Sequence, residues 1–396
     1  MKMIDTGKGR ISVVALMGIW SVSALTSLPG LAVSPISEEL AHIFPKATEL
    51  DIQMLTTLPS LLIIPFILLA GFMGERIGHI RLLYIGLSLF LLSGALYFVC
   101  SDIMQLIVVS GMLGIGAGII VPLSTALVPR FFAGEERTRQ YGYVSAITNI
   151  SLVVATAITG WLADIQWRLP FVVYLLPIIS LMLVPAIKKA EGGVAAKSGN
   201  ENLGASGHVY YKILCKYMLY YFFITYLVMV VSINLPFLMG EYGYDASVSG
   251  MVISIFFLAM MLPGLFINRI LAVVGNSVIY WALLLISLGL LDVFLNRSLP
   301  LLVVGCVATG FGYGMAQPYV YDRGSLAATS DKVTYVMAMV MVMNYIAIVV
   351  SPFVVEMMQW LFGVSGDGSP FLLNAIAAAV ALALMLVRKT IVSKRK

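Results

Sequence analysis

The feature that most constrains this chain is a series of long apolar stretches with almost no charge inside them. An apolar run of about 18 or more residues can cross the roughly 30 Å hydrocarbon core of a bilayer as a helix. Such runs recur throughout, and because 60% of the residues are hydrophobic and only 11% charged, a soluble globular fold is excluded. We predict twelve spans, near residues 11–34, 52–73, 82–99, 104–128, 141–163, 170–187, 213–238, 248–267, 276–295, 299–320, 333–355 and 370–387. The first span is expected to be retained rather than cleaved, because further spans follow it.

The positions of Lys and Arg predict the orientation, since basic residues near span ends are kept on the cytoplasmic side. With the N-terminus inside, all 24 basic residues except Lys46, Arg168 and Arg297 fall in inner segments. We therefore expect both termini in the cytoplasm and a location in a bacterial inner or plasma membrane. The basic residues are dispersed among loops, so no nucleic-acid partner is expected.

Metal, cofactor and enzyme functions find little support. The three cysteines, Cys100, Cys215 and Cys306, lie far apart in or beside apolar spans, which predicts neither a disulfide framework nor a metal site. The glycine triplet "GIGAG" lies inside an apolar span rather than between a strand and a helix, so no nucleotide cofactor is expected. Since no nucleophile, acid–base pair or metal cluster converges near an interface, we expect no enzyme activity; a membrane-embedded lipid-modifying enzyme is the remote alternative.

The chain divides into two halves that repeat short motifs. The segment "KKAEGGVAAKSGNENLGASGH" from Lys188 reads as a flexible linker, which predicts bundles of six spans at 1–187 and 212–396 joined by a cytoplasmic linker at 188–211. "GIGAGIIVP" from Gly114 matches "GFGYGMAQP" from Gly310, and "NISLVVAT" from Asn149 matches "NYIAIVVS" from Asn344. Repeats in the same order with similar spacing indicate a duplication.

The inner loop "GFMGERIGHIRLL", which begins at Gly71, resembles the signature loop of the major facilitator superfamily. The matching positions are Gly71, Glu75, Arg76, Gly78 and Arg81. The resemblance implies an all-α, multi-pass membrane protein with twelve transmembrane helices in two pseudo-symmetric six-helix bundles. It also implies secondary active transport by alternating access, with a substrate site between the halves near mid-membrane.

In the superfamily this loop is similarly thought to act as a conformational latch, usually with Asp where this chain has Glu75. Gly71 would let a neighbouring helix approach closely, and Glu75 could accept hydrogen bonds from the helix start after Asp331. Arg76 and Arg81 could then pair with Glu135 or Glu136 in the next inner loop. The alternative is an ordinary loop whose positive charge only sets the topology.

Two positions depart from the pattern of proton-driven drug exporters in the superfamily. Ser110 falls where such exporters carry Arg, and "ATAITG" from Ala155 keeps only the last glycine of their span 5 element. Export of small neutral or weakly polar organic molecules is nevertheless the first interpretation, by superfamily frequency. An uptake symporter or facilitator of a small metabolite is the alternative.

Uncharged polar residues in the spans are the candidates for substrate contact. Thr309, Tyr313 and Gln317 are spaced four apart and so share a helix face, whereas their repeat counterparts are apolar. Helix–helix hydrogen bonding is the alternative role for all candidates. The predicted substrate-binding residues are Trp20, Asn149, Tyr221, Thr225, Tyr313, Gln317, Asn344 and Tyr345.

Acidic residues are absent from mid-span, which limits where ion coupling could occur. Charged side chains in a membrane are costly and usually functional. Glu356 near an outer end and Asp322 near an inner end are the coupling candidates for a proton or sodium ion, although both could be solvated helix-end residues. The expected partners are therefore a small-molecule substrate, a coupling ion and the bilayer around a monomer.

Overall fold

The computed structural model of the chain describes residues 3–33, 36, 40, 43–45, 47–163, 165–198, 208–329 and 332–394. Within these ranges the side chains of Glu49, Glu75, 193–198, Ala246, Ser247 and 391–394 are not described. Lys46 and Asp331, which entered the sequence predictions, lie outside the described residues.

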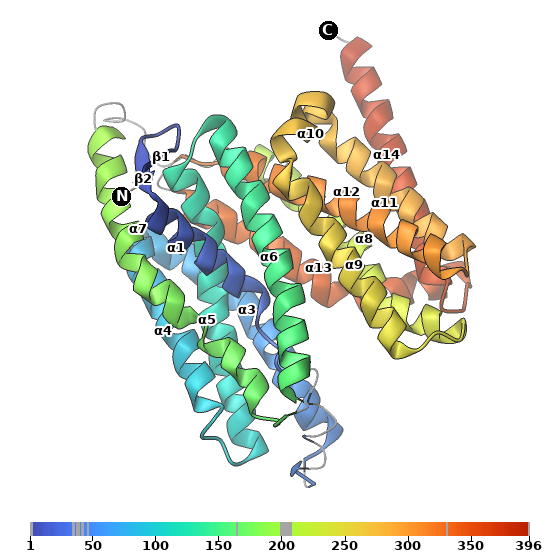
Figure 1. Cartoon of the computed structure of the whole chain (residues 1–396). Coiled ribbons are helices and arrows are strands. Elements are labelled where there is room, and N and C mark those ends of the chain that lie inside the picture. The colour runs from blue at the N-terminus through green and yellow to red at the C-terminus, as the bar shows by residue number, and fades with distance from the viewer. Residues whose placement is uncertain are drawn as a thin grey trace. The chain divides into compact units, whose positions relative to one another are not determined.

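The described chain is almost entirely helical (Figure 1). Eleven of the described helices are long and apolar enough to cross a membrane, and Val13–Ser27 is a shorter apolar helix. The multi-pass, all-α prediction is therefore confirmed. The elements are β1 (Met3–Asp5), β2 (Arg10–Ser12), α1 (Val13–Ala24), η1 (Leu25–Ser27), α3 (Glu49–Ile77), α4 (His79–Leu96), α5 (Ile103–Phe131), α6 (Gly134–Ala163), η3 (Leu169–Leu175), α7 (Pro177–Ser198), α8 (Tyr211–Glu241), α9 (Ala246–Leu265), α10 (Ile267–Val274), η4 (Gly275–Ser277), α11 (Val278–Leu295), α12 (Leu299–Ser325), α13 (Val333–Phe362) and α14 (Ser369–Lys394).

Two helix ends differ from the predicted bounds, each for a local reason. The first span was predicted to reach residue 34, but α1 ends at Ala24 and its 3₁₀ extension at Ser27. Pro29 and Gly30, whose φ is +80°, prevent the helix from continuing. The linker was predicted to begin at Lys188, yet α7 continues to Ser198, because the Ala, Lys and Glu residues there are good helix formers.

Glycines let two central helices pack closely on their neighbours. A Cβ at Gly114 of α5 would lie 2.5 Å from Pro59 Cα, and one at Gly118 would lie 2.9 Å from the Ile63 carbonyl oxygen, both in α3. In α12, a Cβ at Gly310 would lie 2.6 Å from the Phe256 carbonyl oxygen of α9. Since real Cβ atoms do not approach so closely, the repeated glycine motifs serve helix packing.

The described residues fall into two compact units by their contacts. The first comprises Met1–Tyr217 with Tyr321–Tyr345, and the second comprises Met218–Val320 with Ile346–Lys396. The end of α12 and the first part of α13 thus group with the first unit, although they belong to the second half of the sequence. An isolated β-bridge between Val209 and Ala328 also joins these two parts of the first unit.

The first described residues form a β-hairpin that the sequence analysis did not predict. Strands β1 and β2 pair antiparallel, with Ile4 opposite Ile11, and the Thr6 side chain in the turn is fully buried. The amide of Ala133 donates to the Thr6 carbonyl oxygen at 3.0 Å, and Lys8 Nζ donates to the Pro129 carbonyl oxygen at 2.6 Å. The hairpin is therefore fixed against the turn between α5 and α6.

Candidate functional site

The described residues of the first unit contain a buried ion pair between segments far apart in sequence. Arg137 Nε in the first turns of α6 donates to Asp322 Oδ1, in the last turn of α12, at 2.8 Å. Their side chains are only 15% and 7% exposed. Removing one partner of such a buried pair leaves an uncompensated charge, which is strongly destabilising. Asp322, predicted as a coupling candidate, is therefore a buried, paired residue and not a solvated helix end.

Further contacts surround this pair and join the same sequence halves. Arg130 Nη2, near the end of α5, donates to Thr334 Oγ1, in the first turn of α13, at 2.9 Å. The ring of Tyr141 in α6 lies 5.7 Å from that of Tyr321. We call Arg130, Arg137, Tyr141, Asp322 and Thr334 the Arg137–Asp322 cluster.

Helix α3 contacts α13 beside this cluster through small residues. A Cβ at Gly71 would lie 2.6 Å from Ala338 Cβ, and one at Gly74 would lie 3.0 Å from Thr334 Cγ2. The rings of Phe72 and Tyr335 lie 5.2 Å apart. The structure thus places Gly71 where the predicted latch needs close approach, whereas the latch function itself stays a prediction.

The charged members of the predicted latch are placed less favourably. Gly78 has a φ of +91° and forms the turn between α3 and α4. Arg76 and Arg81 are exposed, and no ion pair joins either to Glu135 or Glu136 among the described side chains. Glu136 pairs instead with Arg139 one turn along α6. The role proposed for the Glu75 side chain lies outside what the structure describes.

The hairpin brings a third cation close to the Arg137–Asp322 cluster. The pKa of Lys8 is lowered, mainly because its ammonium group is partly removed from water and also because Arg137 and Arg130 lie nearby. A lowered lysine pKa means that docking of the hairpin becomes more favourable as pH rises through the folded-state value toward 10.5. Lys8 is thus a cation held beside two arginines of the cluster, Arg137 and Arg130.

The second unit holds a polar cluster that includes four predicted substrate-binding residues. Tyr221 of α8 and Tyr313 of α12 have hydroxyl oxygens 3.4 Å apart, and Gln317 Nε2 donates to the Tyr221 hydroxyl at 3.2 Å. Thr225 also hydrogen bonds to Tyr313. The two tyrosines and Thr225 are buried, and Gln317 is half-buried. We call these residues the Tyr221–Tyr313 cluster; it carries hydroxyl and amide groups and no charge.

The polar candidates in the N-terminal spans belong to the first unit. Trp20 Nε1 of α1 donates to Gln140 Oε1 of α6 at 3.0 Å, so this indole holds the two helices together. Asn149 is buried and donates to the Ser145 carbonyl oxygen of its own helix at 2.8 Å. These contacts fit the alternative helix-packing role and leave substrate contact as a prediction.

The other predicted residues differ in their surroundings. Asn344 and Tyr345 are half-buried in α13, within the first unit, and Glu356 further along that helix is exposed. Thr309 does not join the Tyr221–Tyr313 cluster, since its hydroxyl donates to the Gly305 carbonyl oxygen and lies against Gly289 of α11. The four-residue spacing on α12 predicted one shared face but could not show that Thr309 packs against α11.

Sequence reasoning missed Arg130 and Arg137, which hold the contacts of the Arg137–Asp322 cluster. Both lie in the inner segment between predicted spans 4 and 5, where they were counted only as topology signals. A buried acid near a span end requires a basic partner, so Asp322 was a signal that could have prompted a search for one.

Comparison with known proteins decides the family. The family model described as Major Facilitator Superfamily matches residues 14–352. The chain belongs to this superfamily. It shares 27% identity over 180 residues with the multidrug transporter MdtP of Bacillus subtilis, covering 44% of this chain and 32% of MdtP. It shares 28% identity over 114 residues with the quinolone resistance protein NorA of Staphylococcus aureus, covering 29% of each. The matches thus span about a third of these curated relatives.

Solved structures of the superfamily share the fold over nearly the whole chain. The human organic anion transporter MFSD10 matches with a TM-score of 0.72 at 18% identity, covering 94% of this chain and 97% of its own. The proton:xylose symporter XylE matches with a TM-score of 0.72 at 13% identity, covering 94% of each chain. At such identities the likeness establishes the fold alone. The predicted two-fold symmetry of the halves stays a prediction.

Proposed function

We propose that the protein is a secondary active transporter that works by alternating access, with the Arg137–Asp322 cluster as its inner gate. The observation that carries this proposal is the buried ion pair between α6 and α12, supported by the close contact of Gly71 with Ala338. Each contact joins residues from opposite halves of the sequence. If the predicted six-span bundles, 1–187 and 212–396, rock about a linker at 188–211, these contacts break when the end of the protein that carries the cluster opens.

The proposed substrates are small neutral or weakly polar organic molecules. The Tyr221–Tyr313 cluster supports this class, because its buried hydroxyl and amide groups can hydrogen bond a neutral molecule and offer no charge to an ion. Export is the proposed direction, supported by the partial matches to MdtP and NorA, whose names denote drug transport and quinolone resistance. Uptake is the alternative outcome.

An accumulation assay with a fluorescent quinolone tests the proposed export. Bacteria lacking their main exporters should accumulate less of a fluorescent quinolone when they express the protein, and a protonophore should remove the difference. Greater accumulation would instead support uptake. Equal accumulation at confirmed expression, together with no quinolone-induced shift in the melting temperature of purified protein, would contradict a quinolone substrate. Thermal-shift measurements with sugars, amino acids and nucleosides would then find the class.

The proposed orientation has both termini and the linker in the cytoplasm. Cysteines placed at residues 46 and 197 in a cysteine-free background can be labelled with an impermeant thiol reagent on intact cells. Position 46 should react and position 197 should not. The reverse pattern would invert the topology, and the Arg137–Asp322 cluster would then lie at the outer end.

A further inference from the structure

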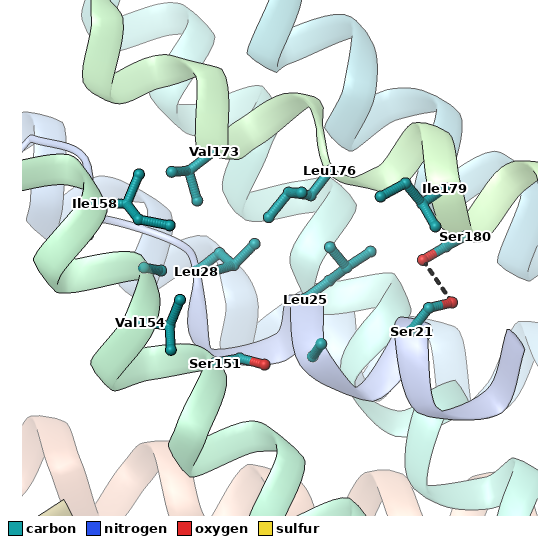
Figure 2. A pocket seen from close by; sticks show the side chains of 12 residues that line it. Ser21, Leu25, Leu28, Ser151, Val154, Ile158, Val173, Leu176, Ile179 and Ser180 are labelled. Atoms are coloured by element: carbon teal, nitrogen blue, oxygen red, sulfur yellow. Dashed lines mark hydrogen bonds between the residues drawn. The ribbon is translucent and has the colours of Figure 1, made fainter. Parts of the chain in front are cut away.

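A pocket in the first unit shares no lining residue with either cluster described above. Figure 2 shows Val154 and Ile158 of α6 on one side, Ile179 and Ser180 of α7 on the other, and Leu25 and Leu28 between them. The cavity has a volume of about 190 Å³. Its walls are apolar except for three serines, Ser21, Ser151 and Ser180.

The pocket lies where the second half of α6 approaches η3 and α7. Helix α1 lies between α6 and α7 in Figure 1 and contacts each of them. Trp20 hydrogen bonds to Gln140 of α6, and Ser21 accepts from Ser180 of α7 at 3.0 Å in the pocket wall. Beyond these contacts Val154 is 48% exposed and Ile179 is 50% exposed. Two apolar helix faces therefore flank an unfilled space.

Water is a poor occupant of this space. The hydroxyls of Ser21 and Ser180 already hydrogen bond to each other, so among the described lining residues Ser151 is the one whose hydroxyl makes no hydrogen bond. A buried water needs two to four polar partners. By contrast, an apolar cavity of about 150 Å³ stays dry and binds benzene, so this slightly larger space suits several methylene groups.

The surroundings of the opening identify the occupant. All the lining residues of α6, η3 and α7 belong to helices long and apolar enough to span a membrane. The pocket is therefore continuous with the surface that the bilayer covers, and the molecules available at its opening are lipid hydrocarbon chains. We propose that this pocket binds one acyl chain of a membrane lipid, which completes the packing between α6 and α7.

Site-resolved photolabelling tests the proposal. The purified protein is reconstituted in phosphatidylethanolamine and phosphatidylglycerol vesicles that contain a trace of phospholipid with a diazirine near the end of one acyl chain. After illumination, labelled residues are mapped by mass spectrometry. Labelling should concentrate on residues 151–158 and 173–180, and exceed that at the lipid-exposed Trp161.

Two variants of α6 separate a specific site from general lipid contact. Ser151→Phe fills the pocket and should reduce labelling of residues 173–180 about tenfold, which corresponds to about 1.4 kcal/mol of lost contact. Ala157→Phe adds the same side chain at an exposed position that does not line the pocket, and should leave the labelling unchanged. Ala24→Phe fills the space from α1 and serves if Ser151→Phe fails to fold.

Some outcomes would overturn the proposal. Labelling spread evenly over the exposed residues, or equally strong in the filled and control variants, would mean that the pocket holds no lipid chain. Loss of labelling in Ala157→Phe as well as in Ser151→Phe would mean that substitutions in α6 reduce labelling without filling the pocket. Because this experiment measures no transport, its failure would leave the proposed transport function untouched.

Discussion

If the Arg137–Asp322 cluster is the proposed inner gate, replacing Asp322 with Asn should open the end of the protein at which the cluster lies. The substitution keeps the side-chain size and removes the only acid that pairs with Arg137 among the described residues. Breaking a buried pair costs about 3–5 kcal/mol, and we take about 3 kcal/mol because Arg137 keeps 15% exposure. This free-energy cost falls on the closed state alone, because water solvates Arg137 when the end is open. The ratio of open to closed molecules should therefore rise about 100-fold.

Thiol accessibility measures this shift. Tyr335→Cys places a reporter in the contact between α3 and α13, where its ring now faces Phe72. In a background without native cysteines, maleimide should modify this position much faster when Asp322 is also Asn. The rate should stop rising once most molecules are in the open state. Asp367→Asn makes the same change at an exposed acid and is the matched control that should not change the rate.

A double-variant cycle tests whether the effect belongs to the ion pair. Arg137→Gln combined with Asp322→Asn should be no more open than either single variant, because the two residues act as one unit. A modification rate within about twofold of the parent for Asp322→Asn would refute the reasoning. Additive effects of the two substitutions would show that each side chain acts through other neighbours.

Three further predictions concern other contacts. Gly71→Val should disrupt the packing against Ala338 at a cost of about 1–3 kcal/mol and slow transport. Gly160→Val is the control, because a Cβ at Gly160 has no neighbouring atom within 4 Å, and it should not slow transport. Equal transport rates in the two variants would mean that the loop at Gly71 only sets the topology. Gln317→Ala should weaken substrate binding about 5- to 150-fold at an unchanged melting temperature, and a lower melting temperature with unchanged affinity would make it a packing residue. Gly7 has a φ of +75°, and a Cβ there would lie 3.0 Å from the Ala133 carbonyl oxygen, so Gly7→Val should release the hairpin. Trypsin should then cleave after Lys8 about tenfold faster in inside-out vesicles. A cleavage rate equal to that of the parent would contradict this prediction.

The helices could be predicted from the sequence because each membrane span must satisfy its own backbone hydrogen bonds. Length and apolarity therefore located the spans. The glycine motifs at Gly114 and Gly310 were visible in the sequence as a repeat, and the structure shows that they allow close helix packing. The end of α1 was harder to predict, because the break depends on the backbone conformation at Gly30.

The site was less predictable because its contacts are long-range. Nothing near Asp322 in sequence shows that it pairs with Arg137, since the chain must fold before two such distant residues can meet. Local spacing likewise placed Thr309 with Tyr313, although packing turns it toward Gly289. By contrast, Tyr313 and Gln317 lie on neighbouring turns of one helix, and their common cluster followed from that spacing.

The docked hairpin at residues 3–12 also governs how the protein should be handled in the laboratory. A fusion partner placed directly ahead of Met3 would be anchored beside the turn that holds Lys8 and Pro129, next to the residues proposed to move. Purification tags and fluorescent reporters there would slow or bias the motion that they are meant to report. Attachment after α14, whose final described turns are helical and whose Arg388 and Lys389 are exposed, avoids this interference.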